Sequence, residues 1–308
     1  APAPAQIVES GFGSTSLFHV HADGRSGRVL SQRVIAGGGG LEPVYALDEA
    51  TAAGQILHAI AADVDGDGMD DIALIRGGSG PAGEPGTLTT HDGFSGAGLY
   101  THQITGPEEA VAAVVADDFD GDGREELVVA VDGGKDQVRF ALIDPYEEAV
   151  RNLGLFDPGE LPQASALLLC SADFNGDHRD DLAVAYPDAD GIGGRTSVTL
   201  FDVETASAIA TAHLPPGVPQ SRELISLQAV REGEEGQMHL AAAVTSVTAT
   251  AQRLRLYLVG ADGAPNLTYD SGEEVDVEAH FFADLAGDGS RNLVVVTSTH
   301  TPDGNRTD

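Results

Sequence analysis

The chain has 308 residues, of which 42% are apolar, so it can bury a core as one large domain or two ordinary ones. It carries 49 acidic against 16 basic residues, which gives a formal net charge of -33. Such an acidic surface repels phosphate backbones and anionic membranes, so we expect neither nucleic-acid binding nor membrane insertion. A salt-adapted source would produce the same bias, and so would carboxylates that await cations.

The first residues, 1–5, lack the basic and apolar segments of a signal peptide, and no window approaches 18 uninterrupted apolar residues. We therefore expect a soluble chain, which is a mature form or an excised domain.

A nine-residue acidic pattern recurs along the chain, each time before an apolar run. Its copies are loop 1 at 63–71 (DVDGDGMDD), loop 2 at 118–126 (DFDGDGREE), loop 3 at 173–181 (DFNGDHRDD) and a degraded copy at 284–292 (DLAGDGSRN). The copies are spaced by 55, 55 and 111 residues, so the last gap hides one more. Residues 231–239 fill that gap and keep the following apolar run but not the acidic loop. The repeat number is therefore five.

Each repeat holds enough short apolar runs for four strands, which in the first complete unit we expect near 56–62, 72–76, 86–91 and 97–104. The hairpin between the last two, at 92–96 (DGFSG), has a counterpart at 23–27 (DGRSG). On that match, 15–21 and 28–35 are the third and fourth strands of a sheet whose first and second strands are 277–283 and 292–299.

The predicted fold is an all-β, five-bladed β-propeller of four-stranded antiparallel blades, with the ring closed by N-terminal strands that join C-terminal strands. We expect one domain over 1–308, with blades at 277–308 together with 1–35, and at 56–104, 111–153, 166–213 and 225–273. The alternatives are an open β-solenoid or two sandwiches, and an open array would leave half-blades exposed at both termini.

The spacing of the acidic pattern places side-chain oxygens at loop positions 1, 3, 5 and 9, with a backbone carbonyl available at position 7. The glycine at position 4 allows the loop to curl, and six or seven oxygens suit a hard cation such as Ca²⁺. The expected side-chain ligands are Asp63, Asp65, Asp67 and Asp71 in loop 1, Asp118, Asp120, Asp122 and Glu126 in loop 2, and Asp173, Asn175, Asp177 and Asp181 in loop 3. The position 7 carbonyls belong to Met69, Arg124 and Arg179.

Other metals and the EF-hand fit this pattern less well. Mg²⁺ needs a smaller octahedron, and softer metals prefer His or Cys ligands. An EF-hand needs a bidentate Glu at position 12 between two helices, where this chain has Leu74, Val129 or Val184 in apolar β runs.

These strings, above all 118–130 and 173–177, resemble the FG-GAP/VCBS repeats of integrin α-subunit propellers and of many secreted bacterial proteins. The resemblance covers four or five repeats, essentially the whole chain. It implies that each loop joins the first and second strands of a blade and holds Ca²⁺, and that the protein is secreted or displayed at the cell surface. Because integrin propellers have seven blades, their ligand surfaces are not carried over.

We accordingly expect about three Ca²⁺ sites, in loops 1 to 3. In the copy at 284–292, Ala286 and Asn292 replace two acidic ligands, so only Asp284 and Asp288 remain and binding is weak or lost. The loop at 231–239 should be empty. Calcium should stabilise the fold, because it relieves the repulsion among clustered carboxylates.

The sequence offers no catalytic residues: it has no HExxH, GxSxG, P-loop or Rossmann fingerprint. The leading hypothesis is a calcium-binding extracellular propeller that acts as a non-enzymatic binding or adhesion module for a protein or glycan. Alternatives are a lectin, which the absence of Trp disfavours, and a polysaccharide lyase or hydrolase with an axial active site. Ligand contacts could come from the loops opposite the calcium loops, where we single out Tyr45, Arg76, Tyr186, Arg195 and His300.

Overall fold

The computed structural model describes residues 6–9, 16–22, 27–34, 41–49, 56–76, 85–106, 109–133, 138–156, 167–187, 196–215, 222–231, 237–247, 252–271, 276–283, 292–300 and 306–307. The chain divides into two compact units, Ala1–Ser165 and Ala166–Asp308. Each unit is described by itself below. The single-domain boundary of 1–308 stays a prediction.

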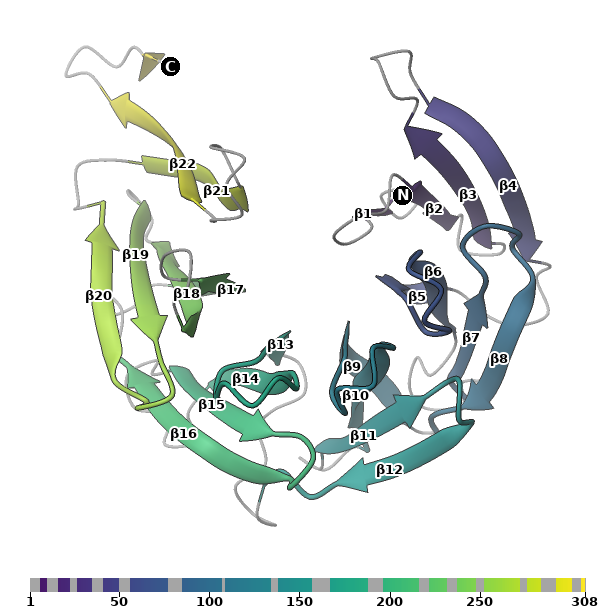
Figure 1. Ribbon diagram of the computed structural model, residues 1–308. Helices are drawn as coiled ribbons and strands as arrows, with labels where there is room; N and C mark the ends of the chain where they lie inside the picture. Colours follow the sequence, from purple (N-terminus) through teal and green to yellow (C-terminus); the bar gives the residue numbers. More distant parts are fainter. Residues whose placement is uncertain are drawn as a thin grey trace. The chain divides into compact units, whose positions relative to one another are not determined.

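The first unit contains three antiparallel sheets of four strands each, and Figure 1 shows the strands of each sheet side by side in chain order. The first sheet consists of β1 (Gln6–Glu9), β2 (Ser16–Ala22), β3 (Gly27–Val34) and β4 (Leu41–Glu49). The second consists of β5 (Ile56–Ala62), β6 (Asp71–Arg76), β7 (Thr87–His91) and β8 (Gly98–Gln103). The third consists of β9 (Ala110–Asp117), β10 (Glu126–Asp132), β11 (Val138–Asp144) and β12 (Ala149–Leu153).

The second unit contains two four-stranded sheets and one of three strands among its described residues. The first has β13 (Leu168–Ala172), β14 (Asp181–Pro187), β15 (Thr196–Asp202) and β16 (Ser207–Leu214). The next has β17 (Arg222–Arg231), β18 (Met238–Val247), β19 (Gln252–Val259) and β20 (Pro265–Asp270). The last has β21 (Asp276–Ala283), β22 (Asn292–His300) and β23 (Arg306–Thr307).

The burial pattern explains why these sheets stack as blades. The second strand of a blade is buried on both faces: all six residues of β6 are buried, and so are the first six of β10. The fourth strand lies at a sheet edge and is mostly exposed, as β12 and β20 show. Neighbouring blades contact through their first strands, β5 with β9 in one unit and β13 with β17 in the other. The apolar runs after the acidic loops are thus the core strands.

Two apolar clusters lie between neighbouring blades. In the first unit, side chains of the second and third sheets pack together, including Ile75, Leu88, Leu127, Val129 and Ile143. In the second unit, an equivalent cluster joins the sheets that begin at β13 and β17 and includes Phe174, Leu200, Leu240 and Val259. Interdigitated apolar side chains of this kind supply most of the free energy that favours folding.

The structure confirms the all-β propeller class and the four strands expected in the unit that begins at residue 56. It does not confirm five blades or a sheet shared between the termini. The described residues form six sheets, and 16–22 and 27–34 are the second and third strands of a complete N-terminal sheet. In the last sheet, β23 follows the two strands that we expected to end the chain.

The incorrect assignment of the N-terminal strands has two physical causes. The DG-containing turn of 92–96 joins the third and fourth strands of its blade, whereas the matching segment 23–27 lies between the second and third strands. No strand was expected between residues 35 and 56, yet β4 lies there at the sheet edge and contains Pro43. Pro is tolerated there, and the register shifts between Ser31 and Gln32, which pair with Tyr45 and Pro43.

Within the described part of the chain we find no helix with the length and apolarity that crossing a membrane requires.

Candidate metal centres

Loops 1 to 3 each connect the first strand of a blade to the second. Loop 1 follows β5, loop 2 follows β9 and loop 3 follows β13, and each ends on the first residue of the next strand: Asp71, Glu126 or Asp181. This is the placement that the family resemblance implied. The three loops therefore occupy equivalent sites in three blades.

The aspartate at position 1 organises each loop by accepting three backbone hydrogen bonds. In loop 1, Asp63 Oδ1 accepts from the N–H of Gly66 at 2.9 Å and of Asp67 at 3.1 Å, and Oδ2 accepts from Gly68 at 2.9 Å. Asp118 and Asp173 accept the same three bonds at positions 4, 5 and 6 of their own loops, over 2.6–3.1 Å. One side chain thus curls the backbone around itself.

The residues at positions 3 and 5 each accept a hydrogen bond from the N–H two residues further on, which is the Asx-turn pattern. Asp65 accepts from Asp67 at 3.1 Å, and Asp67 accepts from Met69 at 2.8 Å. Loops 2 and 3 repeat both bonds. These turns set the directions of the side-chain oxygens.

Positions 4 and 6 both have left-handed backbone conformations. The φ angles at position 4 are 76° at Gly66, 78° at Gly121 and 83° at Gly176. Position 6 has φ of 84° and 89° at Gly68 and Gly123, but loop 3 has His178 there, at 71°. A left-handed conformation at position 6 is therefore a second constraint, which favours glycine but admits His178 in loop 3.

Positions 2 and 9 anchor each loop to the core. The apolar side chain at position 2 is buried in all three loops, as Val64, Phe119 and Phe174. The N–H of the same residue donates to the carboxylate at position 9, over 3.2 Å to Asp71, 2.9 Å to Glu126 and 3.0 Å to Asp181. Each of these carboxylates is only 1–2% exposed. All three loops are therefore fixed to the core by the same two contacts.

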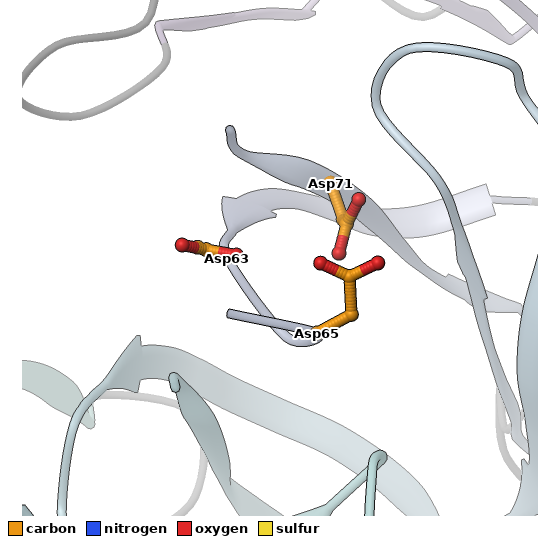
Figure 2. Close-up of side chains that lie close together, drawn as sticks. All are labelled: Asp63, Asp65 and Asp71. Carbon is orange, nitrogen blue, oxygen red and sulfur yellow. The ribbon is translucent and has the colours of Figure 1, made fainter. Parts of the chain in front are cut away.

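Carboxylate oxygens converge in loops 1 and 2. One oxygen from each of Asp63, Asp65 and Asp71 lies within 4.8 Å of the other two, and the same holds for Asp118, Asp120 and Asp122. Figure 2 shows the carboxylates of Asp65 and Asp71 facing each other, with Asp63 to one side of this pair. The structure therefore brings together three of the four side chains that the spacing selected in each of loops 1 and 2.

Asp92 is a residue that sequence reasoning missed. One of its oxygens clusters within 4.8 Å of oxygens of Asp65 and Asp67, although it belongs to the hairpin after β7. Asp144 and Asp202 stand at the same place, at the ends of β11 and β15, and all three aspartates accept from the N–H three residues on. In the sheet of β17 to β20, whose loop at 231–239 lacks the acidic pattern, Gly260 follows β19 instead of an aspartate. Comparison of the residues after the third strands across the repeats would have identified the hairpin aspartate.

Burial raises the pKa of the position 9 carboxyls. The pKa of Asp71 is raised to about 7, that of Glu126 to about 8 and that of Asp181 to about 7, mainly by burial and further by nearby aspartates. Burial also raises the pKa of Asp65 and Asp120, and the aspartates at positions 1 and 5 add to it. The metal-free loops hold negative charge at an electrostatic cost that a cation would remove.

Loop 3 reduces this repulsion internally. Its position 3 is Asn175, whose Nδ2 donates to Asp181 Oδ1 at 3.1 Å, while its backbone N–H donates to Asp181 Oδ2 at 3.0 Å. An amide oxygen remains a suitable calcium ligand.

Position 7 contacts the hairpin between the third and fourth strands. In loop 2, the Arg124 guanidinium lies 4.0 Å from the centroid of the Tyr146 ring. In loop 3, Arg179 forms an ion pair with Glu204. Tyr146 and Glu204 each lie two residues after their hairpin aspartate, so the same two positions meet in both blades.

The structure describes the side chains of two of the five residues suggested for an opposite ligand face, Arg76 and Tyr186. Arg76 is 2% exposed in β6, so it cannot serve as a surface contact. Tyr186 is half-buried in β14 rather than in a loop, and its hydroxyl lies 3.3 Å from Thr199 Oγ1. Tyr45 and His300 belong to β4 and β22, and Arg195 lies outside the described residues. Both Arg76 and Tyr186 thus lie in second strands of their blades and not in the loops that follow them.

The degraded copy lies outside the described residues, which exclude 284–291 and so both Asp284 and Asp288. The same holds for 232–236 in the loop expected to be empty. Weak binding in the one and none in the other stay predictions.

Residues 168–201, which span loop 3 and the strands on both sides of it, match the model of the FG-GAP repeat. The chain contains an FG-GAP repeat. Loops 1 and 2 share the hydrogen-bond plan of this repeat, which supports the resemblance noted in the sequence. No curated protein matches the chain significantly.

Similar solved structures agree with the β-propeller fold. Sqt1 of Saccharomyces cerevisiae is 12% identical and has a TM-score of 0.53, over 94% of this chain and 69% of that one. A protein of Lactobacillus plantarum is 13% identical and also has a TM-score of 0.53, over 100% of this chain and 85% of that one. Identities this low bear on the fold alone.

Proposed function

We propose that this protein binds Ca²⁺ in loops 1, 2 and 3 and acts outside the cell as a non-enzymatic binding or adhesion module that calcium stabilises. The observation that carries the proposal is the recurrence of one loop plan in three blades, with convergent carboxylates in loops 1 and 2. A solvated acidic turn has no need to repeat the same hydrogen bonds at the same positions three times.

The donor groups suit calcium. Each loop offers side-chain oxygens at positions 1, 3, 5 and 9 and no His or Cys from the ligand positions, which favours a hard cation. Bound Ca²⁺ would supply positive charge, and its coordination by the loop oxygens would hold the loop closed. The protein's own part is to aim the oxygens by Asx turns and to fix both loop ends in the core.

The binding role is supported by the FG-GAP repeat and by exposed side chains near the acidic loops. Phe94 is 58% exposed and Tyr146 is 55% exposed, and they occupy the same position in the hairpins of two blades of one unit. Exposed aromatic side chains are common anchors in protein interfaces. We place the contact face on this loop end, in preference to the opposite end that includes buried Arg76.

Isothermal titration with Ca²⁺ tests the metal sites, with about three ions bound per chain as the expected result. The informative variant combines Asp67→Asn, Asp122→Asn and Asp177→Asn, because Asn keeps the acceptor oxygen of the turn but removes the charge. The matched control is Asp262→Asn, since Asp262 Oδ1 accepts the same kind of bond from Ala264 at 3.0 Å outside the loops. The triple variant should bind Ca²⁺ more weakly, and an undiminished affinity would contradict the assignment.

A screen of glycans and proteins, run with and without Ca²⁺, tests the binding role. Hits that weaken in Phe94→Ala and Tyr146→Ala support the proposed contact face. Hits that are indifferent to both changes would move the contact face elsewhere.

A further inference from the structure

Loops 1 and 2 contact each other directly through a reciprocal pair of hydrogen bonds. The N–H of Glu125 donates to the carbonyl oxygen of Asp63 at 2.9 Å. The N–H of Asp63 donates to Glu125 Oε2 at 3.2 Å. Asp63 is position 1 of loop 1, and Glu125 is position 8 of loop 2. The bridge therefore joins the residue that organises one loop to the residue just before the end of the other.

A second contact joins the same loops at the left-handed glycine of loop 1. A Cβ atom on Gly66 would lie 2.9 Å from Arg124 Cγ and 3.9 Å from the carbonyl oxygen of Gly123. The backbone of loop 1 is thus packed against residues 123–125 of loop 2. These contacts are independent of the Asp63–Glu125 bridge.

The segment 123–125 belongs to loop 2 and also contacts loop 1. Arg124 is position 7, whose backbone carbonyl is the expected ligand of loop 2, while its side chain covers Gly66 of loop 1 and lies over Tyr146. Glu125 follows at once and holds the Asp63 backbone. Anything that orders this segment in loop 2 also restricts the start of loop 1.

We propose that calcium binding in loop 2 raises the calcium affinity of loop 1, with Glu125 as the positioning residue that couples them. This inference rests on the proposed calcium binding. Once loop 2 is ordered, loop 1 loses less conformational freedom when it closes on its own ion, because Asp63 is already held. Thermodynamic linkage makes the effect reciprocal, so loop 1 strengthens loop 2 by the same factor.

The test follows each loop separately in protein labelled with ¹⁵N-glycine, at about 0.15 M salt to screen long-range charge effects. The amides of Gly66 and Gly68 report calcium binding in loop 1, and those of Gly121 and Gly123 report loop 2. Loop 2 is disabled by Asp120→Ala with Asp122→Ala, which removes two expected ligand side chains, and the Gly121 amide checks that its calcium response is lost. We expect this change to weaken calcium binding at loop 1 by about five-fold or more, the low end of typical allosteric coupling.

Glu125→Ala removes the side-chain half of the bridge and should weaken the coupling, so that disabling loop 2 in this background alters the affinity of loop 1 by less than about two-fold. Glu125→Gln keeps an acceptor oxygen and should restore coupling, whereas Glu148→Ala removes an exposed carboxylate from the hairpin beyond loop 2 and should leave coupling intact. Arg124→Ala, which removes the packing on Gly66, is a second variant if Glu125→Ala does not fold.

The outcomes separate the two proposals. If Gly66 shifts with Ca²⁺ but its titration is unchanged when loop 2 is disabled, the coupling is wrong and calcium binding stands. If the Gly66 and Gly121 amides do not respond to Ca²⁺ in the natural protein, both proposals are wrong.

Discussion

The backbone N–H of Gly93 donates a hydrogen bond to Asp71 Oδ1 at 2.8 Å. This bond ties the hairpin after β7 to the last residue of loop 1, while the other oxygen of Asp71 accepts from Val64. A carboxylate that is 1% exposed is therefore bonded on both oxygens. The acidic loop and the hairpin beyond it form one structural unit.

Gly93→Ala should destabilise the protein by about 3 kcal/mol, because the new Cβ would lie 2.0 Å from the carbonyl oxygen of Asp70. Urea denaturation measures the loss. Gly98→Ala, where nothing lies within 4 Å, is the matched control and should change stability by less than about 0.5 kcal/mol. Equal effects of the two changes would refute the close approach.

His178→Gly should stabilise the protein by about 0.5 kcal/mol, since relief of the left-handed conformation outweighs the added freedom of the unfolded chain. The N–H that donates to Asp173 is retained. The converse changes Gly68→Ala and Gly123→Ala, which meet no atom within 4 Å, should each cost about 1 kcal/mol through conformation alone. Chemical denaturation of all three variants in excess EDTA provides the comparison, and a destabilised His178→Gly would contradict it.

Chelation of calcium should lower the melting temperature. Saturation at about 100 times Kd stabilises the folded state by about 2.7 kcal/mol per site, so loss of three sites should lower Tm by on the order of 10 °C. Differential scanning calorimetry at low salt, with EDTA and then with excess Ca²⁺, measures the shift. Added Mg²⁺ should restore less of it, because Mg²⁺ retains its water more strongly. An unchanged melting temperature would show that calcium does not stabilise the fold.

The calcium-free protein should lose stability as pH rises from about 4 to about 8. Asp71, Glu125, Glu126 and Asp181 have pKa values raised to about 7 or 8, mainly by burial, so the folded state holds protons that the unfolded state has already released. Folding is therefore favoured most below the unfolded pKa values near 4 and least above the folded ones.

Melting curves in EDTA at pH 5, 6, 7 and 8 measure this trend. Saturating Ca²⁺ should flatten it, because the ion replaces the protons as the compensating charge. A melting temperature in EDTA that rises steadily over this range would show that these carboxyls are not buried as described.

Much of the candidate site was predictable because its chemistry is local. The ligand positions of loop 1 follow from spacing, and the apolar run after it identified β6. Asp92 was not predictable from one loop alone, since its approach to Asp65 depends on how the third strand returns along the second. The burial of Arg76 was missed for a related reason: β6 is covered on both faces up to its last residue.

The arrangement of the blades was harder to predict than their content. A turn such as 23–27 specifies a hairpin but not which two strands of a blade it joins. The strand β4 was not expected; it contains Pro43, and its edge position makes the missing N–H of that residue harmless. Strand pairing over long separations depends on packing that no single turn encodes.

The meeting of loop position 7 with the hairpin tip bears on how such repeats can be engineered. Arg124 with Tyr146 and Arg179 with Glu204 are matched partners that come from separate stretches of one blade. An acidic loop grafted alone into the blade at 222–270 would arrive without its partner, and Gly260 would stand where the donor blades have aspartate. The smallest transplantable cassette is therefore discontinuous, a loop together with the hairpin that flanks it.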